Sequence, residues 1–239
     1  PGGAVQIIPV SDGAMDCAGI ITANVTGLAD VAGEGPEPEF VDVNAAGQIA
    51  VTLQENNHIV VLNADGSVAS HFSAGSVDLQ NVDVDEERAL TFDGTLNDVP
   101  REPDAIQWLD NDRLVIANEG DWKGGSRGFT IFNKDGTELF ESGLQLEYEA
   151  AMLGHYPERR SGNKGVEPEG MEIGTFADAT YMFILLERSS LVGVYRDTGG
   201  DPEFVQALPS GVGPEGAVAI PDRNLFITAN EVDLIEDGS

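Results

Sequence analysis

The stretch "GVEPEGMEI", Gly165–Ile173, places a proline between two glutamates directly before a short apolar run. Three further copies share its core of a proline, an acidic residue, one variable residue and an apolar segment. They are "EPEFVDV" (Glu37–Val43), "EPDAIQW" (Glu102–Trp108) and "GPEGAVAI" (Gly213–Ile220). Proline fixes its own φ and favours an extended residue before it, so each copy is typical of the entry to a β-strand. The chain therefore repeats one structural unit.

A second apolar segment follows each copy and meets a glutamate 15 to 18 residues after the motif acid. These glutamates are Glu55, Glu119, Glu187 and Glu231. In three copies a third segment follows ("HIVVLN", "GFTIFN" and "LVGVYR"), ends at a turn signal such as "ADG" or "KDG", and is succeeded by a fourth. Four short strands per unit, repeated about every 40–65 residues, are typical of a β-propeller blade.

The sequence thus predicts an all-β fold, a β-propeller of four-stranded antiparallel blades that is incomplete in this chain. Residues 1–36 are predicted to supply a strand or partial blade, and the blades to span 37–100, 101–165, 166–212 and, in part, 213–239. Since propellers have about 4–8 blades, we expect the remaining blades to come from the same polypeptide or from another chain. "EYEAAML" (Glu147–Leu153) could form a short helix, and "DLQNVDVDEER" (Asp78–Arg88) is interpreted as a solvated connector.

The charge of the chain excludes some partners. There are 42 acidic against 12 basic side chains, a formal net charge of −30, and such a surface repels nucleic acid and anionic membranes. No apolar run approaches the roughly 18 residues of a membrane span. The single cysteine, Cys17, cannot form an intrachain disulfide and leaves the compartment undecided. No basic and apolar leader opens the chain, so any signal peptide is expected to have been removed.

The repeat predicts a ring of acids. In a blade the start of the first strand and the end of the second lie on the same face, near the channel. The predicted metal-ligating set is Glu39, Glu55, Asp104, Glu119, Glu169, Glu187, Glu215 and Glu231. So many carboxylates repel each other unless neutralised, and calcium, which takes 6–8 oxygen ligands, suits them. The alternative is that each acid accepts hydrogen bonds from backbone amides of a neighbouring loop.

Basic residues are predicted on the same face. The candidate anion-binding set is Lys123, Arg127, Arg159, Arg160, Lys164 and Arg188. One explanation is local pairing with the acids, since arginine pairs readily with carboxylate. The other is an anionic ligand, such as a phosphate ester, held beside a metal ion. No motif identifies an activated nucleophile, so no catalytic residue is assigned.

At these motifs the chain resembles a known family. "VEPEGMEIGTFADATYMFILLERSS", "GPEGAVAIPDRNLFITANEVD" and "LVIANEGD" are similar to the secreted bacterial propellers of the choice-of-anchor I family. That family is similar in turn to esterase-like phytase and alkaline phosphatase-like propellers. The resemblance covers roughly residues 37 to 233 and implies the propeller fold, an extracytoplasmic location and calcium at the motif acids. It implies no catalytic set.

Two functions remain open from the sequence. The first is a calcium-binding propeller, secreted, periplasmic or on the cell surface, that acts as a binding module for a surface ligand. The second is a metal-dependent phosphoesterase acting on a phosphorylated small molecule. In that case Glu169, Glu187, Glu119 and Asp104 would hold the metal that activates water, and Arg159, Arg160 and Lys164 would hold the phosphate.

Overall fold

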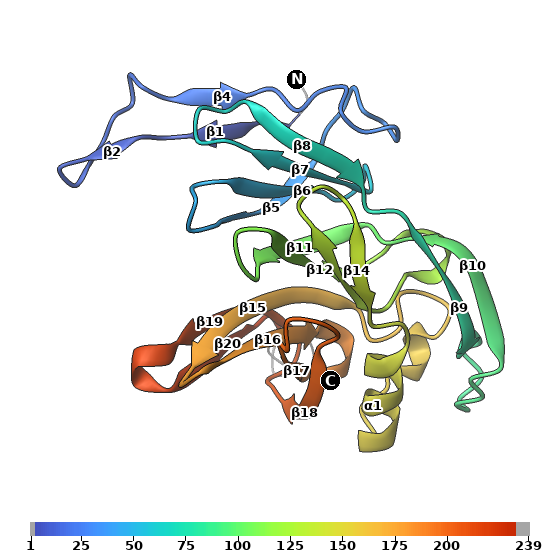
Figure 1. Cartoon of the computed structure of the whole chain (residues 1–239). Coiled ribbons are helices and arrows are strands. Elements are labelled where there is room, and N and C mark those ends of the chain that lie inside the picture. Colours follow the sequence, from blue (N-terminus) through green and yellow to red (C-terminus); the bar gives the residue numbers. More distant parts are fainter. Residues whose placement is uncertain (1–2, 233–239) are drawn as a thin grey trace.

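The computed structural model describes residues 3–232 and contains three four-stranded antiparallel sheets (Figure 1). The first sheet consists of β5 (Pro38–Val43), β6 (Ile49–Leu53), β7 (His58–Leu62) and β8 (Val68–Ser73). The second consists of β11 (Pro103–Trp108), β12 (Arg113–Asn118), β13 (Phe129–Asn133) and β14 (Glu138–Glu141). The third consists of β15 (Pro168–Phe176), β16 (Ala179–Leu186), β17 (Leu191–Arg196) and β18 (Glu203–Pro209). Strands are in chain order within each sheet, so the predicted four-stranded units are confirmed.

Smaller sheets lie before and after these three. The pairs are β1 (Val5–Ile7) with β4 (Ile21–Ala23), β2 (Val10–Ser11) with β3 (Ala14–Met15), and β19 (Pro214–Ile220) with β20 (Leu225–Asn230). Figure 1 shows the main sheets following one another in chain order, from blue to red. Residues 3–232 form an open series of sheets and do not close a ring. The end of the predicted unit 213–239, residues 233–239, lies outside the described residues.

Apolar layers between neighbouring sheets hold the series together. Strands β6 and β7 are buried at every residue, because the second and third strand of a blade face a neighbouring layer on both sides. Ile59 of the first sheet shares a core with Ile116 of the second, and Phe129 of the second with Met182 of the third. A further core, around Phe183, joins the third sheet to β19 and β20. The fold is therefore a stack of sheets packed face to face.

The first strands of the sheets, β5, β11, β15 and β19, lie next to one another. Side chains tie each to the next. The backbone N–H of Trp108 donates to Asp42 Oδ2 (2.8 Å), and Gln107 Nε2 donates to Glu172 Oε2 (2.9 Å). The other oxygen of Glu172 accepts the N–H of Ala219 (3.0 Å). Trp108 is 7% exposed, in agreement with a core position. Some acids of the first strands thus connect blades by accepting hydrogen bonds.

The repeated motif produces a repeated irregularity. Each of these four strands has a register shift directly after its proline, between Pro38 and Val41, Pro103 and Ile106, Pro168 and Met171, and Pro214 and Gly216. The motif acid lies inside each shift. A bulge of this kind re-aims a side chain and bends the strand. The motif therefore determines where the acid points as well as where the strand begins.

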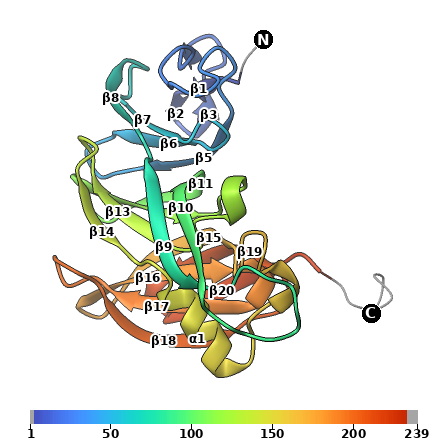
Figure 2. The ribbon, with the colours of Figure 1, turned by 90° about the vertical axis from the view of Figure 1, so that its right-hand side faces the viewer.

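Two segments stand outside the repeat. A hairpin of β9 (Ser76–Val82) and β10 (Gly94–Pro100) follows the first sheet, and helix α1 (Gln145–Leu153) follows the second. Figure 2 shows the hairpin running from the first sheet past the second toward α1. The prediction of a connector over Asp78–Arg88 was wrong in its first half, which is part of β9, because alternate β9 residues pack into a small core with Leu144. The predicted short helix is present as α1.

Four 3₁₀ turns complete the described structure: η1 (Trp122–Gly124), η2 (Glu158–Arg160), η3 (Glu187–Ser189) and η4 (Pro221–Arg223). Over residues 3–232 no helix has the length and the apolar character that a membrane crossing requires.

The glycine of the third motif allows close approach of two first strands. A Cβ atom at Gly170 would lie 2.0 Å from the carbonyl oxygen of Glu215 on β19. At the equivalent position of the fourth motif, a Cβ on Gly216 would meet nothing nearer than the Cβ of Ala229 at 3.7 Å. We predict that Gly170→Ala destabilises the protein by about 1–3 kcal/mol, the usual effect of overpacking. Gly216→Ala is the matched control and should leave the urea midpoint nearly unchanged; equal effects would contradict the close contact.

Candidate functional site

The strand register places the motif acids beside the glutamates that end the second strands. Pro103 pairs with Asn118, Pro168 with Leu186 and Pro214 with Asn230, so Glu119, Glu187 and Glu231 each follow directly after the paired residue. In the first sheet Pro38 pairs with Leu53, and the residue after Leu53 is Gln54. The predicted equivalence of Glu55 was therefore wrong by one residue. The spacing of residues does not show where the second strand ends and the turn begins. The prediction therefore assigned Glu55 to the position that Gln54 occupies.

Two groups of three carboxylates lie close enough to bind one ion each. Oxygens of Glu167, Glu169 and Glu187 all lie within 4.8 Å of one another, and so do oxygens of Glu187, Glu215 and Glu231. Glu187 belongs to both groups and is 3% exposed. We call these five glutamates the axial cluster. It brings together four of the eight predicted ligands, one motif acid and one strand-end acid from each of two neighbouring sheets.

Burial and mutual repulsion raise the pKa values of two members of the axial cluster, Glu169 and Glu187. Burial raises the pKa of Glu169, and the hydrogen bond and charge of Glu187 raise it further, with smaller contributions from Glu119 and Asp104. Burial also raises the pKa of Glu187. Two carboxylates in contact share a proton readily because both cannot ionise without a counterion. The Oε2 atom of Glu169 is buried and has no hydrogen-bond partner among the described residues.

The other predicted ligands extend the acidic region toward the first two sheets. Burial raises the pKa of Asp104 to about 7, and the charges of Glu119, Glu39 and Glu215 add to this effect. Glu39 has a raised pKa as well, from burial and then from the charges of Glu37, Glu119 and Glu55. These four predicted ligands, Glu39, Glu55, Asp104 and Glu119, form no group of three at metal-binding distance within residues 3–232, although their charges interact. Each first strand therefore contributes an acid to one continuous region of negative charge.

The basic residues of the motif region are paired with its acids. Glu167, 1% exposed, accepts from Arg160 Nη2 (2.7 Å) and Arg188 Nε (2.9 Å), and Lys164 Nζ lies 3.4 Å from it. Lys164 Nζ also lies 2.6 Å from Glu119 Oε1. Three of the predicted anion-binding residues thus form local ion pairs. This agrees with the first of the two explanations, that the basic residues pair with the acids.

The remaining predicted anion-binding residues do not converge on the axial cluster. Arg127 is fully buried and bonded to Glu147 of α1, so it cannot receive a ligand from solvent, and its assignment to an anion site was wrong. The β9–β10 hairpin and α1, the two segments outside the repeat, bury it, and the repeat pattern could not reveal their packing. Lys123 pairs with Asp98 of β10 at 2.8 Å. Arg159 is exposed and takes part in no ion pair within residues 3–232.

Two positions of the acidic region, Glu167 and Gln54, were not predicted from the sequence. Glu167 precedes the motif proline and completes the first carboxylate group, while Gln54 donates to Glu119. A signal for Glu167 was present, since the residue before the proline is glutamate in three of the four copies. The fourth has Gly213, and its φ of +66° shows that this position takes the left-handed conformation; Glu167 adopts it too, with φ of 55°. Glycine tolerates that conformation without strain, whereas a glutamate there is strained.

The stacked four-stranded sheets, with acids gathered where the first strands meet, define a propeller-like all-β protein. The model of the choice-of-anchor I domain matches residues 17–124 and 123–200, and the chain belongs to this family. No curated protein matches it.

One solved structure with a TM-score above 0.5 supports the propeller-like fold, and two others are similar at lower scores. A streptogramin B lyase is similar with a TM-score of 0.51 and 12% identity, over 82% of this chain and 48% of that one. Virginiamycin B lyase from Staphylococcus aureus follows with a TM-score of 0.49 and 12% identity, over 82% of this chain and 49% of that one. A putative 6-phosphogluconolactonase from Bacteroides uniformis has a TM-score of 0.39 and 13% identity, over 88% of this chain and 66% of that one. The chain spans about half the length of the two lyases, and at this identity the likeness concerns the fold alone.

The raised pKa values predict how stability depends on pH when divalent cations are chelated. Folded Glu169 and Asp104 keep protons that the unfolded chain releases near its ordinary values of 4.5 and 3.8. The folded state therefore binds more protons, and the free energy of unfolding falls as the pH rises above these values, through about 7 for Asp104. Glu169→Gln removes one such group and should flatten the slope between pH 5 and 8, by up to about 1.4 kcal/mol per pH unit.

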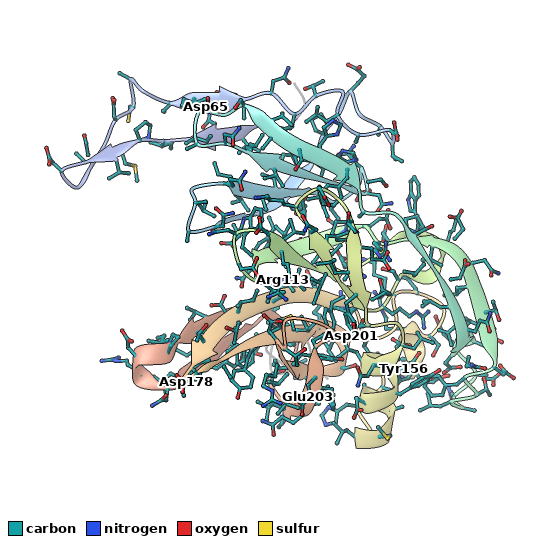
Figure 3. The ribbon with its side chains drawn as sticks, in the orientation of Figure 1. Asp65, Arg113, Tyr156, Asp178, Asp201 and Glu203 are labelled. Carbon is teal, nitrogen blue, oxygen red and sulfur yellow. The ribbon has the colours of Figure 1, made fainter. Side chains whose placement is uncertain are left out.

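The matched control is Asp178→Asn, an exposed acid at the turn between β15 and β16, the far end of the same hairpin (Figure 3). This control should keep the slope of the parent protein in urea unfolding at each pH. A Glu169→Gln slope equal to that of the parent would show that Glu169 ionises normally in the folded protein.

Proposed function

We propose that this choice-of-anchor I protein is a surface-associated, propeller-like binding module whose axial cluster binds Ca²⁺. One observation carries the proposal. Two groups of three carboxylates share the buried Glu187, and a buried oxygen of Glu169 has no donor among the described residues. A buried acceptor without a partner needs an explanation, and a bound cation is one such explanation. The membership of the chain in the family supports a surface-related role.

The oxygen ligands of the axial cluster favour a hard cation that accepts irregular coordination geometry. All five side chains of the axial cluster offer carboxylate oxygens, and none offers sulfur or imidazole. Calcium accepts six to eight such oxygens in flexible arrangements, with water completing the shell, whereas Mg²⁺ requires a near-ideal octahedron. Glu215 and Glu231 are exposed, which leaves room for water on that side. Bound Ca²⁺ would relieve the repulsion that otherwise holds a proton between Glu169 and Glu187.

The open ends of the stack support the proposed completion by further blades. At one end the β1–β4 pair packs on β6 and β7, and Val41 and Val43 of β5 stay exposed beside β1. At the other end Val218 of β19 and Ile227 of β20 are exposed. In the interior of the stack the corresponding layers are covered by a neighbouring sheet. We keep the proposal that blades of the same polypeptide or of another chain cover these ends. A surface ligand would then meet the acidic region from the face where the motifs lie.

No observation favours the phosphoesterase alternative. Of the cations predicted to hold the phosphate, Arg160 and Lys164 are paired with Glu167 and Glu119. Arg159, the third, is exposed and forms no ion pair within residues 3–232. An incoming phosphate would have to break these ion pairs and approach a region of excess negative charge. Hydrolysis of a generic phosphomonoester with Ca²⁺ and with chelator remains a direct check. Chelator-sensitive turnover lost in Glu169→Gln would overturn the proposal of a pure binding module.

Calcium titration tests the proposal. We expect binding by isothermal calorimetry with a Kd of about 10⁻⁴–10⁻³ M, the usual range of extracellular modules. Glu187→Gln should weaken binding at least tenfold because it removes a ligand of both groups, while Asp178→Asn should bind as the parent does. Affinity should rise with pH, because the ion must displace the proton shared by Glu169 and Glu187, and proton release should appear as a dependence on buffer ionisation enthalpy.

Circular dichroism and the urea midpoint in chelator must show that Glu187→Gln is folded. If it is, two results would refute a calcium site at the axial cluster. They are an absence of binding up to 10-fold above the expected range in the parent, and parental affinity in the variant.

A further inference from the structure

The two segments outside the repeat build one structure together. The turn of the β9–β10 hairpin, residues 83–93, lies against α1 and the segment after it. Tyr148 Oη of α1 donates to the carbonyl of Asn81 (2.8 Å). The ring of Phe92 makes edge contacts with Tyr148 (5.3 Å between centroids) and Tyr156 (5.5 Å). The backbone N–H of Arg88 donates to the Glu158 carboxylate. Neither segment is required by the blade pattern, yet each covers the other.

A buried polar network fixes this arrangement. Arg127 Nη1 donates to Glu147 Oε2 of α1 (3.1 Å) and to the carbonyl of Asp83 (2.9 Å). Ser161 Oγ donates to Asp83 Oδ2 (3.0 Å). These side chains are fully buried, and a satisfied buried network specifies one geometry. The helix and the turn are therefore held rigidly relative to the second and third sheets.

The rigid unit presents apolar side chains to solvent. Met152 is 71% exposed, Leu153 52%, Leu90 44% and Tyr148 38%. Beside them a cavity of about 290 Å³ opens between the turn and the end of α1, lined by Ala89, Leu90, Ala151, Gly154 and Tyr156, with Arg88 and Glu158 completing the lining. Figure 3 labels Tyr156 at the side of α1. We call the four exposed side chains and this cavity the α1 surface. Exposed apolar side chains gathered near a cavity with a polar border are typical of an interaction site.

Acids border the α1 surface in excess over bases. Asp85, Glu86 and Glu87 are exposed on the turn, Glu149 lies on α1, and Glu158 is at the cavity, against Arg88 and Arg159. A second copy of this chain would bring an identical acidic border against it, and an anionic membrane would be repelled as well. A partner with basic side chains next to apolar ones matches the surface in both respects.

We propose that the α1 surface binds an amphipathic basic segment of another protein, with an apolar side chain of that segment in the cavity and its basic side chains against the acidic border. The site is independent of the axial cluster, and binding does not require Ca²⁺. Helix-in-groove recognition uses the same combination of apolar anchors and flanking charges. The anchors of this chain are Leu90 of the hairpin turn, which lines the cavity, and Met152 of α1, which follows the cavity-lining Ala151 in the sequence.

The test uses a fluorescent synthetic helical peptide of Leu and Lys with all Leu on one face, at 0.15 M salt and in chelator. Anisotropy should report saturable binding to the parent protein. Leu90→Gln and Met152→Gln should each weaken it about tenfold. Leu139→Gln is the matched control, because Leu139 of β14 is 44% exposed like Leu90 but lies between the outer strands of the second and third sheets. Amide exchange should slow in residues 84–93 and 145–154 on binding.

Each remaining outcome is decisive against the proposal. Equal binding by the parent and the three variants, or equal binding of a scrambled peptide without an apolar face, would mean attraction by net charge alone. Equal binding of a Leu and Glu peptide would remove the role of the acidic border. Dimerisation of the parent that Met152→Gln abolishes would assign the surface to a second copy. Because all measurements are made in chelator, their results do not depend on whether the axial cluster binds calcium.

Discussion

Crowding of carboxylates between adjacent first strands is the constraint on which the rest of this structure depends. The stack of sheets brings β5, β11, β15 and β19 side by side, and each strand carries an acid directly after its first residue, a proline. Two features of the structure reduce this repulsion. Three cations surround Glu167, and the pKa values of Glu169 and Glu187 rise so that a proton is retained. Together they reduce the repulsion only in part, because the carboxylates still outnumber the cations around them.

The apolar layers are what keep the acids together against that repulsion. Each pair of sheets buries aliphatic and aromatic side chains over a whole face, and burial of apolar area is the dominant favourable term in folding. Acids such as Asp42 and Glu172 meanwhile accept hydrogen bonds between neighbouring first strands. The same residue type therefore plays two roles on one strand. Acids inside the bulge gather in the negative region, while acids farther along the strand join one blade to the next.

The repeat made most of the fold predictable from sequence, and its exceptions explain the errors. Four copies of a proline-acid motif, each followed by turns at regular intervals, indicated the four-stranded sheets and the neighbourhood of their acids. The position of Gln54 was missed because a count of residues cannot distinguish a glutamate at the strand end from one a residue beyond it. Arg127 was misassigned because the insertions that bury it carry no repeat against which to align them. Long-range packing of non-repeated segments is the part that local patterns do not encode.

The bulge after each motif proline also has a consequence for how the chain can vary. Side chains of a strand alternate between its two faces, so a change of one residue between the proline and the apolar run would exchange those faces along the whole strand. A whole blade, by contrast, begins and ends at the same point of the motif, and its insertion or removal would leave every other register intact. The fold should therefore tolerate the insertion or deletion of an entire blade. It should not tolerate the insertion or deletion of a single residue at the Pro-acid dipeptide. Families built on this motif would vary in length by blades, with the dipeptide as the fixed boundary between one unit and the next.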